Sequence, residues 1–241
     1  MFQIDTKLFL LVGSLKRYET WCKIKSSEEA TKTLSEIHLG IKNTVDATPD
    51  DIWRFAERLL QMRKHCFKSV PLFSSAASLY AERANQWNAL SKCKQNIMAA
   101  VASCVKGIHL ATVQMMVNDE SNKTTIQHHV IPLMRDILAR LEKVESVEKT
   151  SETVDIVSVL HSIGKSEREI HELRAAAITF EDALDRLDET FSCSETKPKI
   201  YSALWEDLGD VFVKMGRPNE VIASYRKAIE VHKCYTAEGE R

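Results

Sequence analysis

Few residues in this chain could do chemistry, and the clearest candidates are two adjacent histidines, His128 and His129. Adjacent side chains on a helix point about 100° apart, so these imidazoles cannot easily share one metal ion. Neither histidine has an acidic or cysteine partner one helical turn away on its own face. We therefore expect no metal site here.

His65 and Cys66 form a second pair, which we interpret as a helix end with the cysteine on a buried stripe. The chain contains no nucleophile elbow, Walker loop, dinucleotide fingerprint or H-E-x-x-H motif. Without converging reactive groups of this kind, we expect no catalysis and no cofactor.

A basic cluster near the N-terminus mixes cations with aromatic rings, a combination that can serve phosphates and bases. Acidic residues interrupt it, and the whole chain has 33 Lys and Arg against 34 Asp and Glu. A solvated amphipathic face explains the cluster more simply. Nucleic-acid binding is kept as the alternative from another functional class, and we do not expect such a partner. The cluster consists of Lys16, Arg17, Lys23, Lys25 and Lys32, beside Tyr18 and Trp21.

The composition predicts an all-α fold. Only 7 glycines and 5 prolines occur in 241 residues, too few for the many tight turns of a sheet protein. The six cysteines form no C-x-x-C pair, which favours reduced thiols in the cytoplasm, with the nucleus as the alternative. No uninterrupted apolar run approaches the ~20 residues needed to span a bilayer, so we expect no membrane insertion.

Capping signals and apolar spacing predict the individual helices. Asn118 to Asn122 is polar and predicted to be a loop, and Pro132 either kinks the helix that follows or marks its start. Gly107 is a candidate bend in the helix before the loop. The helices are predicted over 26–41, 48–66, 71–84, 87–108 and 126–144, before the C-terminal third.

The C-terminal third contains one spacing of small and large residues twice. The second copy reads Trp205, Leu208, Gly209, Phe212, Val221, Tyr225 and Ala228, and the first reads Leu160, Ile163, Gly164, Glu167, Ala176, Phe180 and Ala183. Both copies resemble the tetratricopeptide repeat, W-x2-L-G-x2-Y followed by a small residue, an aromatic and an alanine. The two copies start 45 residues apart, against a family period of ~34, so residues 191–201 form an insertion.

The resemblance implies antiparallel helical hairpins stacked as a right-handed superhelix. We expect an N-terminal helical array over 1–148, itself similar to such repeats, and two repeat hairpins within 149–241, at 157–190 and 202–235. Small residues allow helices to approach closely, so Gly164 and Gly209 should lie at tight crossings. Gly216 and Pro218 should form the last interhelical turn.

Proteins of this family are usually interaction scaffolds, in which the first helices of successive hairpins line a concave groove. Members that clamp a chaperone's C-terminal carboxylate carry lysine and asparagine where this chain has Glu206 and Asp210, so we do not expect that ligand. Acids there would suit a ligand with some positive charge. The alternative is that the groove residues are simply solvated. The groove positions carry over to His161, Lys165, Arg168, Glu206, Asp210, Val213 and Lys214, with Ser158, Glu169 and Ala203 beside them.

The predicted function is a scaffold or adaptor that binds a partner peptide or helix as a subunit of a larger complex. The segment 76–87 looks a little like the hairpins of soluble NSF attachment proteins, so a vesicle-trafficking adaptor is the specific alternative. The last helix carries apolar residues where a terminal unit normally has a polar cap. We expect it to contact a partner chain, a second copy in a homodimer, or further sequence, through Val221, Ile222, Tyr225 and Ile229.

Overall fold

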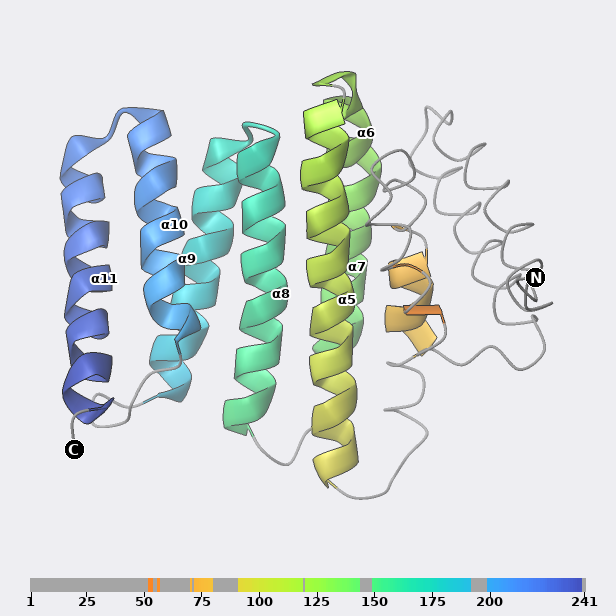
Figure 1. Cartoon of the computed structure of the whole chain (residues 1–241), viewed down its shortest axis with the longest axis horizontal. Helices are drawn as coiled ribbons and strands as arrows, with labels where there is room; N and C mark the ends of the chain where they lie inside the picture. The colour runs from red at the N-terminus through yellow and green to blue at the C-terminus, as the bar shows by residue number, and fades with distance from the viewer. Residues whose placement is uncertain are drawn as a thin grey trace, which may run out of the picture.

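The described part of the chain is entirely helices and the turns between them, which confirms the all-α prediction. Figure 1 shows the helices from α5 to α11 standing side by side in a row, with α5 and α7 at one end and α11 at the other. The expected helices over 26–41 and 48–66 lie outside this part, apart from helical residues 52, 53 and 56. This computed structural model describes residues 52, 53, 56, 70, 72–79, 91–118, 120–143, 149–191 and 199–239.

Seven α-helices make up most of the described residues, and short 3-10 and π segments separate the first three of them. The 3-10 helix η2 (Glu120–Asn122) and the π-helix η3 (Ile126–Val130) lie between α5 and α7. The α-helices are α5 (Ser91–Asn118), α6 (Lys123–Thr125), α7 (Ile131–Leu141), α8 (Lys149–Glu169), α9 (Leu173–Thr190), α10 (Ile200–Met215) and α11 (Pro218–Gly239).

The junction after α5 differs from the predicted loop. Helix α5 continues ten residues beyond the predicted end at 108, and Glu120–Asn122 form a 3-10 turn instead of an irregular segment. The reason is local: the side-chain amide of Asn122 donates a hydrogen bond to the Met115 carbonyl at 3.0 Å. That bond satisfies one of the orphan carbonyls at the end of α5 and so favours a tight connection.

Pro132 sits at the second position of α7, directly after the π-helix. Proline has no backbone N–H and is tolerated only in the first turn of a helix, so the regular ladder restarts at this point. The widened π turn before it accommodates the backbone hydrogen bond that Pro132 cannot donate. Pro132 thus lies where π geometry changes to α geometry within helical backbone that already begins at Lys123, so it does not mark the start of the helix.

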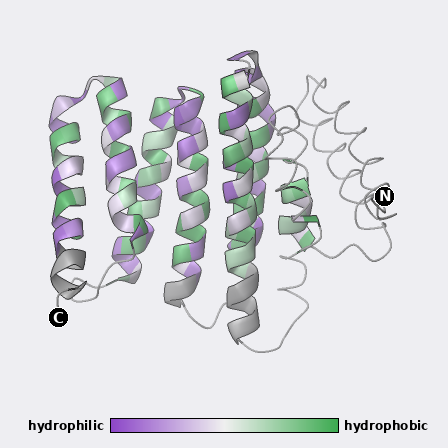
Figure 2. Ribbon diagram, in the orientation of Figure 1, coloured by the Kyte–Doolittle hydropathy of each residue, from purple (hydrophilic) through white to green (hydrophobic). Residues whose placement is uncertain are grey.

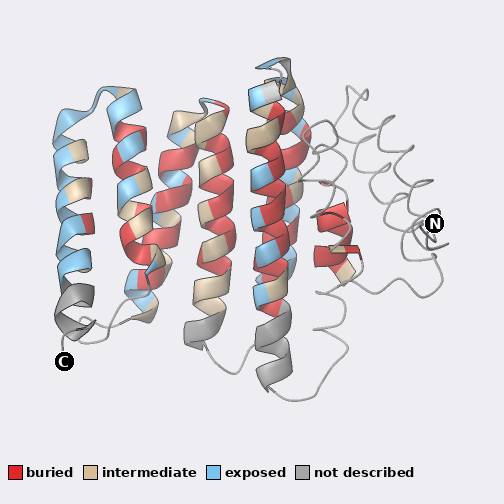
Figure 3. Ribbon diagram, in the orientation of Figure 1, coloured by how far each residue is buried: buried red, intermediate tan, exposed pale blue. Residues whose placement is uncertain are grey.

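Helices α8 and α9 pack as one antiparallel pair, and α10 and α11 pack as another. Helix α8 also contacts α5 and α7, while α9 contacts α10, so the pairs form a continuous stack. Hydropathy alternates around α8, α9 and α10 in Figure 2, and Figure 3 shows their buried residues facing neighbouring helices. Helix α11 shows mostly exposed residues in the same view because nothing described covers its outer side.

Both predicted glycine crossings are confirmed. A Cβ built on Gly164 would come within 2.5 Å of Cε1 of Phe180 in α9, and one on Gly209 within 2.8 Å of Cε1 of Tyr225 in α11. Each glycine therefore lets its own hairpin close around an aromatic ring sixteen residues later. Gly107 repeats this relationship with Phe73, at 2.6 Å from Cζ, where the aromatic comes from an earlier helix.

The two hairpins also turn in the same way. In the second, Gly216 is left-handed at φ 70°, Arg217 N–H donates to the Phe212 carbonyl at 3.0 Å and Gly216 N–H to Val213 at 3.1 Å. This pattern is a Schellman motif, and it confirms the predicted turn.

The first hairpin has the same motif one repeat earlier. Glu172 N–H donates to the Glu167 carbonyl at 2.9 Å and His171 N–H to Arg168 at 3.1 Å, with His171 left-handed at φ 63°. A histidine therefore occupies the position that glycine holds in the other turn, a conformation that a side chain rarely adopts.

Helix α5 is more apolar than the sequence analysis allowed. Met98–Val117 is long and apolar enough to cross a membrane by length and composition, although Lys106 interrupts it. Within the structure 56% of that stretch is buried against other helices, as in the core helix of a folded domain.

Candidate partner-binding groove

A cavity of about 440 Å³ opens between α5, α8 and the start of α10. Its volume lies in the range of small-ligand pockets and would hold one or two side chains of a bound segment. The lining comprises Ala99, Ala102, Ser103, Lys106, His109 and Leu110 from α5, Asp155, Ser158, His161, Ser162 and Lys165 from α8, and Ile200 from α10.

Two of the seven groove residues predicted from the sequence, His161 and Lys165, line this cavity, and the neighbouring position Ser158 lines it as well. They occupy one face of α8 because their spacings of three and four residues match the helical repeat. Ser158 and Ser162 donate their hydroxyl hydrogens to carbonyls one turn earlier, at 2.8 and 3.0 Å. Their hydroxyls are therefore held along α8.

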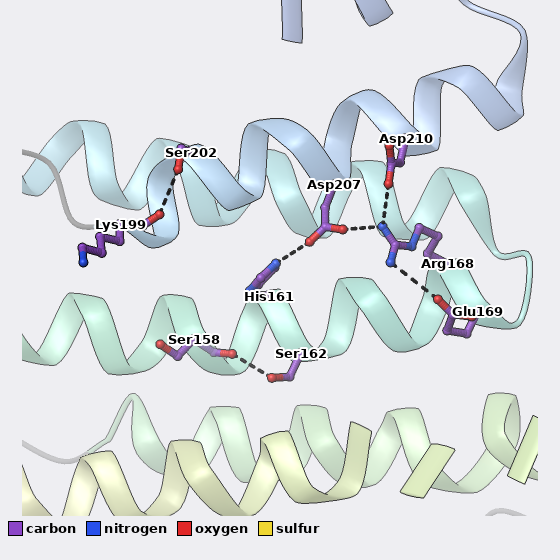
Figure 4. A network of polar contacts seen from close by, with 9 residues as sticks. All are labelled: Ser158, His161, Ser162, Arg168, Glu169, Lys199, Ser202, Asp207 and Asp210. Carbon is purple, nitrogen blue, oxygen red and sulfur yellow. Dashed lines mark hydrogen bonds and ion pairs between the residues drawn. The ribbon is translucent and has the colours of Figure 1, made fainter. Parts of the chain in front are cut away.

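A polar network joins α8 to α10 beside the cavity, and Figure 4 shows Asp207 placed between His161 and Arg168. Asp207 accepts hydrogen bonds from His161 Nε2 at 2.6 Å and from Arg168 Nη1. Arg168 also reaches Asp210 at 3.4 Å and Glu169 at 3.5 Å. Thus His161, Arg168 and Asp210 are brought together, with Asp207 as their common partner.

This network stabilises the ionised form of the Asp207 carboxyl. Burial alone would raise the pKa of the Asp207 carboxyl, but the hydrogen bond from His161 and the charge of Arg168 hold that pKa below its usual value. The Arg168 side chain is only 13% exposed. Because a buried cation needs its counter-ion, Arg168 serves first to hold α8 against α10.

His109 forms the buried wall of the cavity on the α5 side. The Ser166 hydroxyl donates to the Ser162 carbonyl at 2.9 Å, so it accepts the hydrogen bond from His109 Nδ1–H at 3.0 Å. Burial, followed by the nearby charge of Lys165, lowers the pKa of His109 to about 4. The imidazole is therefore neutral at physiological pH and bridges α5 to α8.

Asp155 is the one acidic residue on the described lining of the cavity. Burial raises the pKa of its carboxyl to about 6. By contrast, Lys106 and Lys165 form no ion pair with any residue that the structure describes. The cavity thus presents two amines without an ion pair against one weakly stabilised carboxylate, and the charge of Lys165 is also felt by Asp207 outside the lining.

The four groove residues predicted from the second hairpin lie elsewhere. Asp210 accepts a hydrogen bond from the Tyr225 hydroxyl at 2.7 Å, which raises the pKa of Tyr225 to about 12. Glu206 is paired with His232 at 3.4 Å on the α11 side and lines a separate hollow there. Val213 and Lys214 are exposed near the end of α10. None of the four contributes to the lining of the 440 Å³ cavity.

The predicted contact surface on the last helix divides into two faces. Val221 and Tyr225 point inward, the first packed on the core and the second against Gly209. Ile222 and Ile229 are exposed by 52% and 54%. They lie seven residues apart on one face of α11, where Ile229 lines the hollow beside Glu206, so they are the part of this set available to another chain.

Sequence reasoning missed Asp207, Lys106 and His109. Asp207 has a weak signal, since His161 and Arg168 lie two turns apart on one helix face and leave room for an acid between them. Lys106 and His109 share a face of α5, but that helix lacks the repeat signature that would have aligned it with α8. The predicted basic cluster at 16–32 and the pair His65 and Cys66 lie outside the described residues.

The adjacent histidines fall in the π-helix, where His128 is exposed and His129 is buried. Among the described residues, no group of three His, Cys, Asp or Glu side chains is placed to hold a metal ion. The absence of a metal site remains a prediction.

Comparison with known proteins gives little further guidance. No family model matches the chain, and no curated protein matches it. Among solved structures, BtubC (BKLC) from P. vanneervenii is similar at 13% sequence identity and a TM-score of 0.33, over 88% of this chain and 93% of that chain. A similarity at this level transfers neither fold nor function.

Proposed function

We propose that this protein is an interaction scaffold or adaptor, a subunit of a larger assembly that binds a partner peptide or helix in the groove between α5, α8 and α10. The observation that carries the proposal is the cavity itself, because three helices from successive parts of the stack line it together. Helix-lined grooves of this kind accept an extended or helical segment along their length.

The matched hairpins support a stack similar to tetratricopeptide repeats. The two glycine-aromatic crossings have the same sequence separation, and both turns have the same Schellman hydrogen bonds. A scaffold built from such units keeps its groove rigid, since each hairpin buries its own core and a face of its neighbour. We place this activity in the cytoplasm, with the nucleus as the alternative, and expect no cofactor, metal or membrane insertion.

A groove-blocking substitution tests the proposal. Ser103 is exposed on α5 and lines the cavity, so Ser103→Trp fills the groove from a position where the core is not disturbed. Arg174→Trp places the same side chain on the exposed surface of α9, which contributes nothing to the lining. Circular dichroism and thermal melting check that both variants fold like the unmodified chain.

Affinity capture with mass spectrometry then compares the three proteins as baits. We expect at least one protein to be captured by the unmodified chain and by Arg174→Trp but lost with Ser103→Trp. Identical captured proteins for all three baits would show that partners bind another surface, and the proposal would be wrong.

A further inference from the structure

The charges at the groove indicate which ligand it selects. Lys106 from α5 and Lys165 from α8 line the same cavity, and neither amine has an ionic partner among the described residues. The charge of Lys165 is felt inside the cavity, because after burial it is the largest contribution that lowers the pKa of His109. An anion placed between them would gain two favourable interactions in a partly desolvated site.

The acids of α10 have other partners, although the charge of Lys165 also acts on Asp207 and lowers the pKa of its carboxyl. Asp207 is held by His161 and Arg168, and Asp210 is held by Arg168 and the Tyr225 hydroxyl. Glu206 lies on the side facing α11. The expectation that acidic groove residues would favour a positively charged ligand rested on Glu206 and Asp210, and both carboxylates are engaged away from the cavity.

Part of the remaining lining is apolar. The rest is polar and comprises the carboxyl of Asp155 with the side chains of Ser103, His109, Ser158, His161 and Ser162. Ala99 and Ala102 leave space over α5, and Leu110 is 45% exposed at the edge of the cavity. Ile200 covers the same opening from the start of α10. A ligand that matches this surface needs an apolar side chain beside its negative charge, which a single inorganic anion lacks.

We propose that the groove recognises an acidic amphipathic segment of a partner protein, with side-chain carboxylates seated between Lys106 and Lys165 and an apolar residue against Leu110 and Ile200. This inference rests on the proposed function, since it names the chemistry of the segment that the scaffold binds. Recognition is by side-chain carboxylates within the segment, so it does not need a free chain end.

Selection from a library of random twelve-residue peptides tests this directly on the full chain. The peptides are displayed through their C-termini, so that no free terminal carboxylate is available. On the unmodified protein we expect enrichment of sequences that combine Asp or Glu with apolar residues. On the double variant Lys106→Glu, Lys165→Glu we expect the acidic preference to be lost and basic residues to appear.

Matched variants separate the acidic preference of the groove from the proposed function itself. Arg174→Glu reverses a charge on α9 outside the cavity and should leave the selection unchanged. Peptides that Ser103→Trp abolishes but that show no acidic preference would overturn this inference while leaving the proposed function standing. Peptides that bind equally well after Ser103→Trp, or a failure to enrich any peptide, would overturn both.

The binding affinity of one enriched peptide, synthesised with an amidated C-terminus, measures how much the two lysines contribute. Reversing both lysines should weaken its binding by roughly tenfold or more, and replacing its Glu residues by Gln should have a similar effect on the unmodified chain. Binding should also weaken with added salt, because both lysines are reached by solvent. Equal affinity of the Glu and Gln peptides would contradict the assignment.

Discussion

Gly164 lies so close to Phe180 that the glycine hydrogen occupies the space a Cβ atom would need, with ring Cε1 only 2.5 Å from that position. Gly209 stands in the same relation to Tyr225 at 2.8 Å. The two rings differ in freedom: Phe180 is fully buried, whereas Tyr225 is partly exposed and tethered to Asp210 through its hydroxyl. The first crossing therefore has less room to adjust than the second.

Replacing Gly164 by alanine should destabilise the protein. Overpacking a buried site typically costs about 1–3 kcal/mol, against a helix-propensity gain of about 1 kcal/mol. We expect a net loss in the free energy of unfolding, measured by urea denaturation, and a smaller loss for Gly209→Ala because Tyr225 can swing outward. A larger loss at Gly209, or a gain at Gly164, would show that the rings do not fill the crossings.

In the turn between α8 and α9, by contrast, a substitution should stabilise the protein. His171 is exposed and left-handed, so replacing it with glycine removes a strained backbone conformation and should stabilise the protein by about 1 kcal/mol. Gly216→Ala should lower stability by a similar amount, since nothing lies within 4 Å of its Cβ position and backbone strain alone is at issue. Differential scanning calorimetry measures both. A lower melting temperature for His171→Gly would contradict the assigned motif.

Asp207 should be the residue on which the α8 to α10 contact depends. Asp207→Asn keeps the shape but removes the charge that Arg168 and His161 face, which we expect to lower the free energy of unfolding by about 2 kcal/mol. In the Arg168→Met background the same substitution should have a much smaller effect, because the cation is already gone. Equal effects in both backgrounds, measured by urea denaturation, would mean that the pair is not coupled.

Stability should fall in mild acid through His109. Its pKa is lowered to about 4 in the folded state, so between about pH 6.5 and 4 the unfolded chain takes up a proton that the native imidazole refuses. The native state therefore loses stability as pH falls through this window, by roughly 3 kcal/mol in all. His109→Gln should flatten this dependence, as measured by urea denaturation at a series of pH values.

Asp155 acts with the opposite sign in an overlapping window. Its pKa is raised to about 6, so the folded state retains a proton that the unfolded chain has lost, and stability falls as pH rises from about 4 to 6. The histidine measurement is therefore made in an Asp155→Asn background. A pH profile there that is identical with and without His109 would contradict the assignment of the acid sensitivity to His109.

The exposed face of α11 that carries Ile222 and Ile229 is tested through these two residues. Both are exposed, so replacing them with serine should change the free energy of unfolding by no more than about 0.5 kcal/mol, whereas Val221→Ser removes core packing and should lower it by about 1 kcal/mol. If two copies associate through this face, the double serine variant should also dissociate at higher protein concentration. Sedimentation velocity over a concentration series measures this, and a wild-type chain that stays monomeric throughout would exclude that homodimer.

Much of the C-terminal third could be predicted because its signals are local. Apolar spacing places α8 to α11, and the close crossings at Gly164 and Gly209 follow from residue size alone. Gly216 before Pro218 signals a turn for backbone reasons that need no tertiary information. The equivalent turn at His171 has no such signal, because the hydrogen bonds of the flanking hairpin impose its left-handed conformation.

The groove was harder to predict because it depends on how separate helices are aligned. Lys165 and His161 could be placed in it from the repeat register. Their counterparts on α5 could not, since no repeat signature fixes the rotation of that helix. The expectation about the groove's charge relied on Asp210, and whether Asp210 faces a ligand or a tyrosine is decided by α11, the next helix along.

The sequential stacking of the helices has a kinetic consequence. Most contacts in the described part join helices that are neighbours along the chain, and even the bridge from His109 to Ser166 spans only 57 residues. Closing such short loops costs little conformational entropy before the stabilising contacts form. Folding can therefore begin at any one hairpin and spread to the next. The polypeptide therefore does not have to bring its distant ends together before any part of it becomes stable.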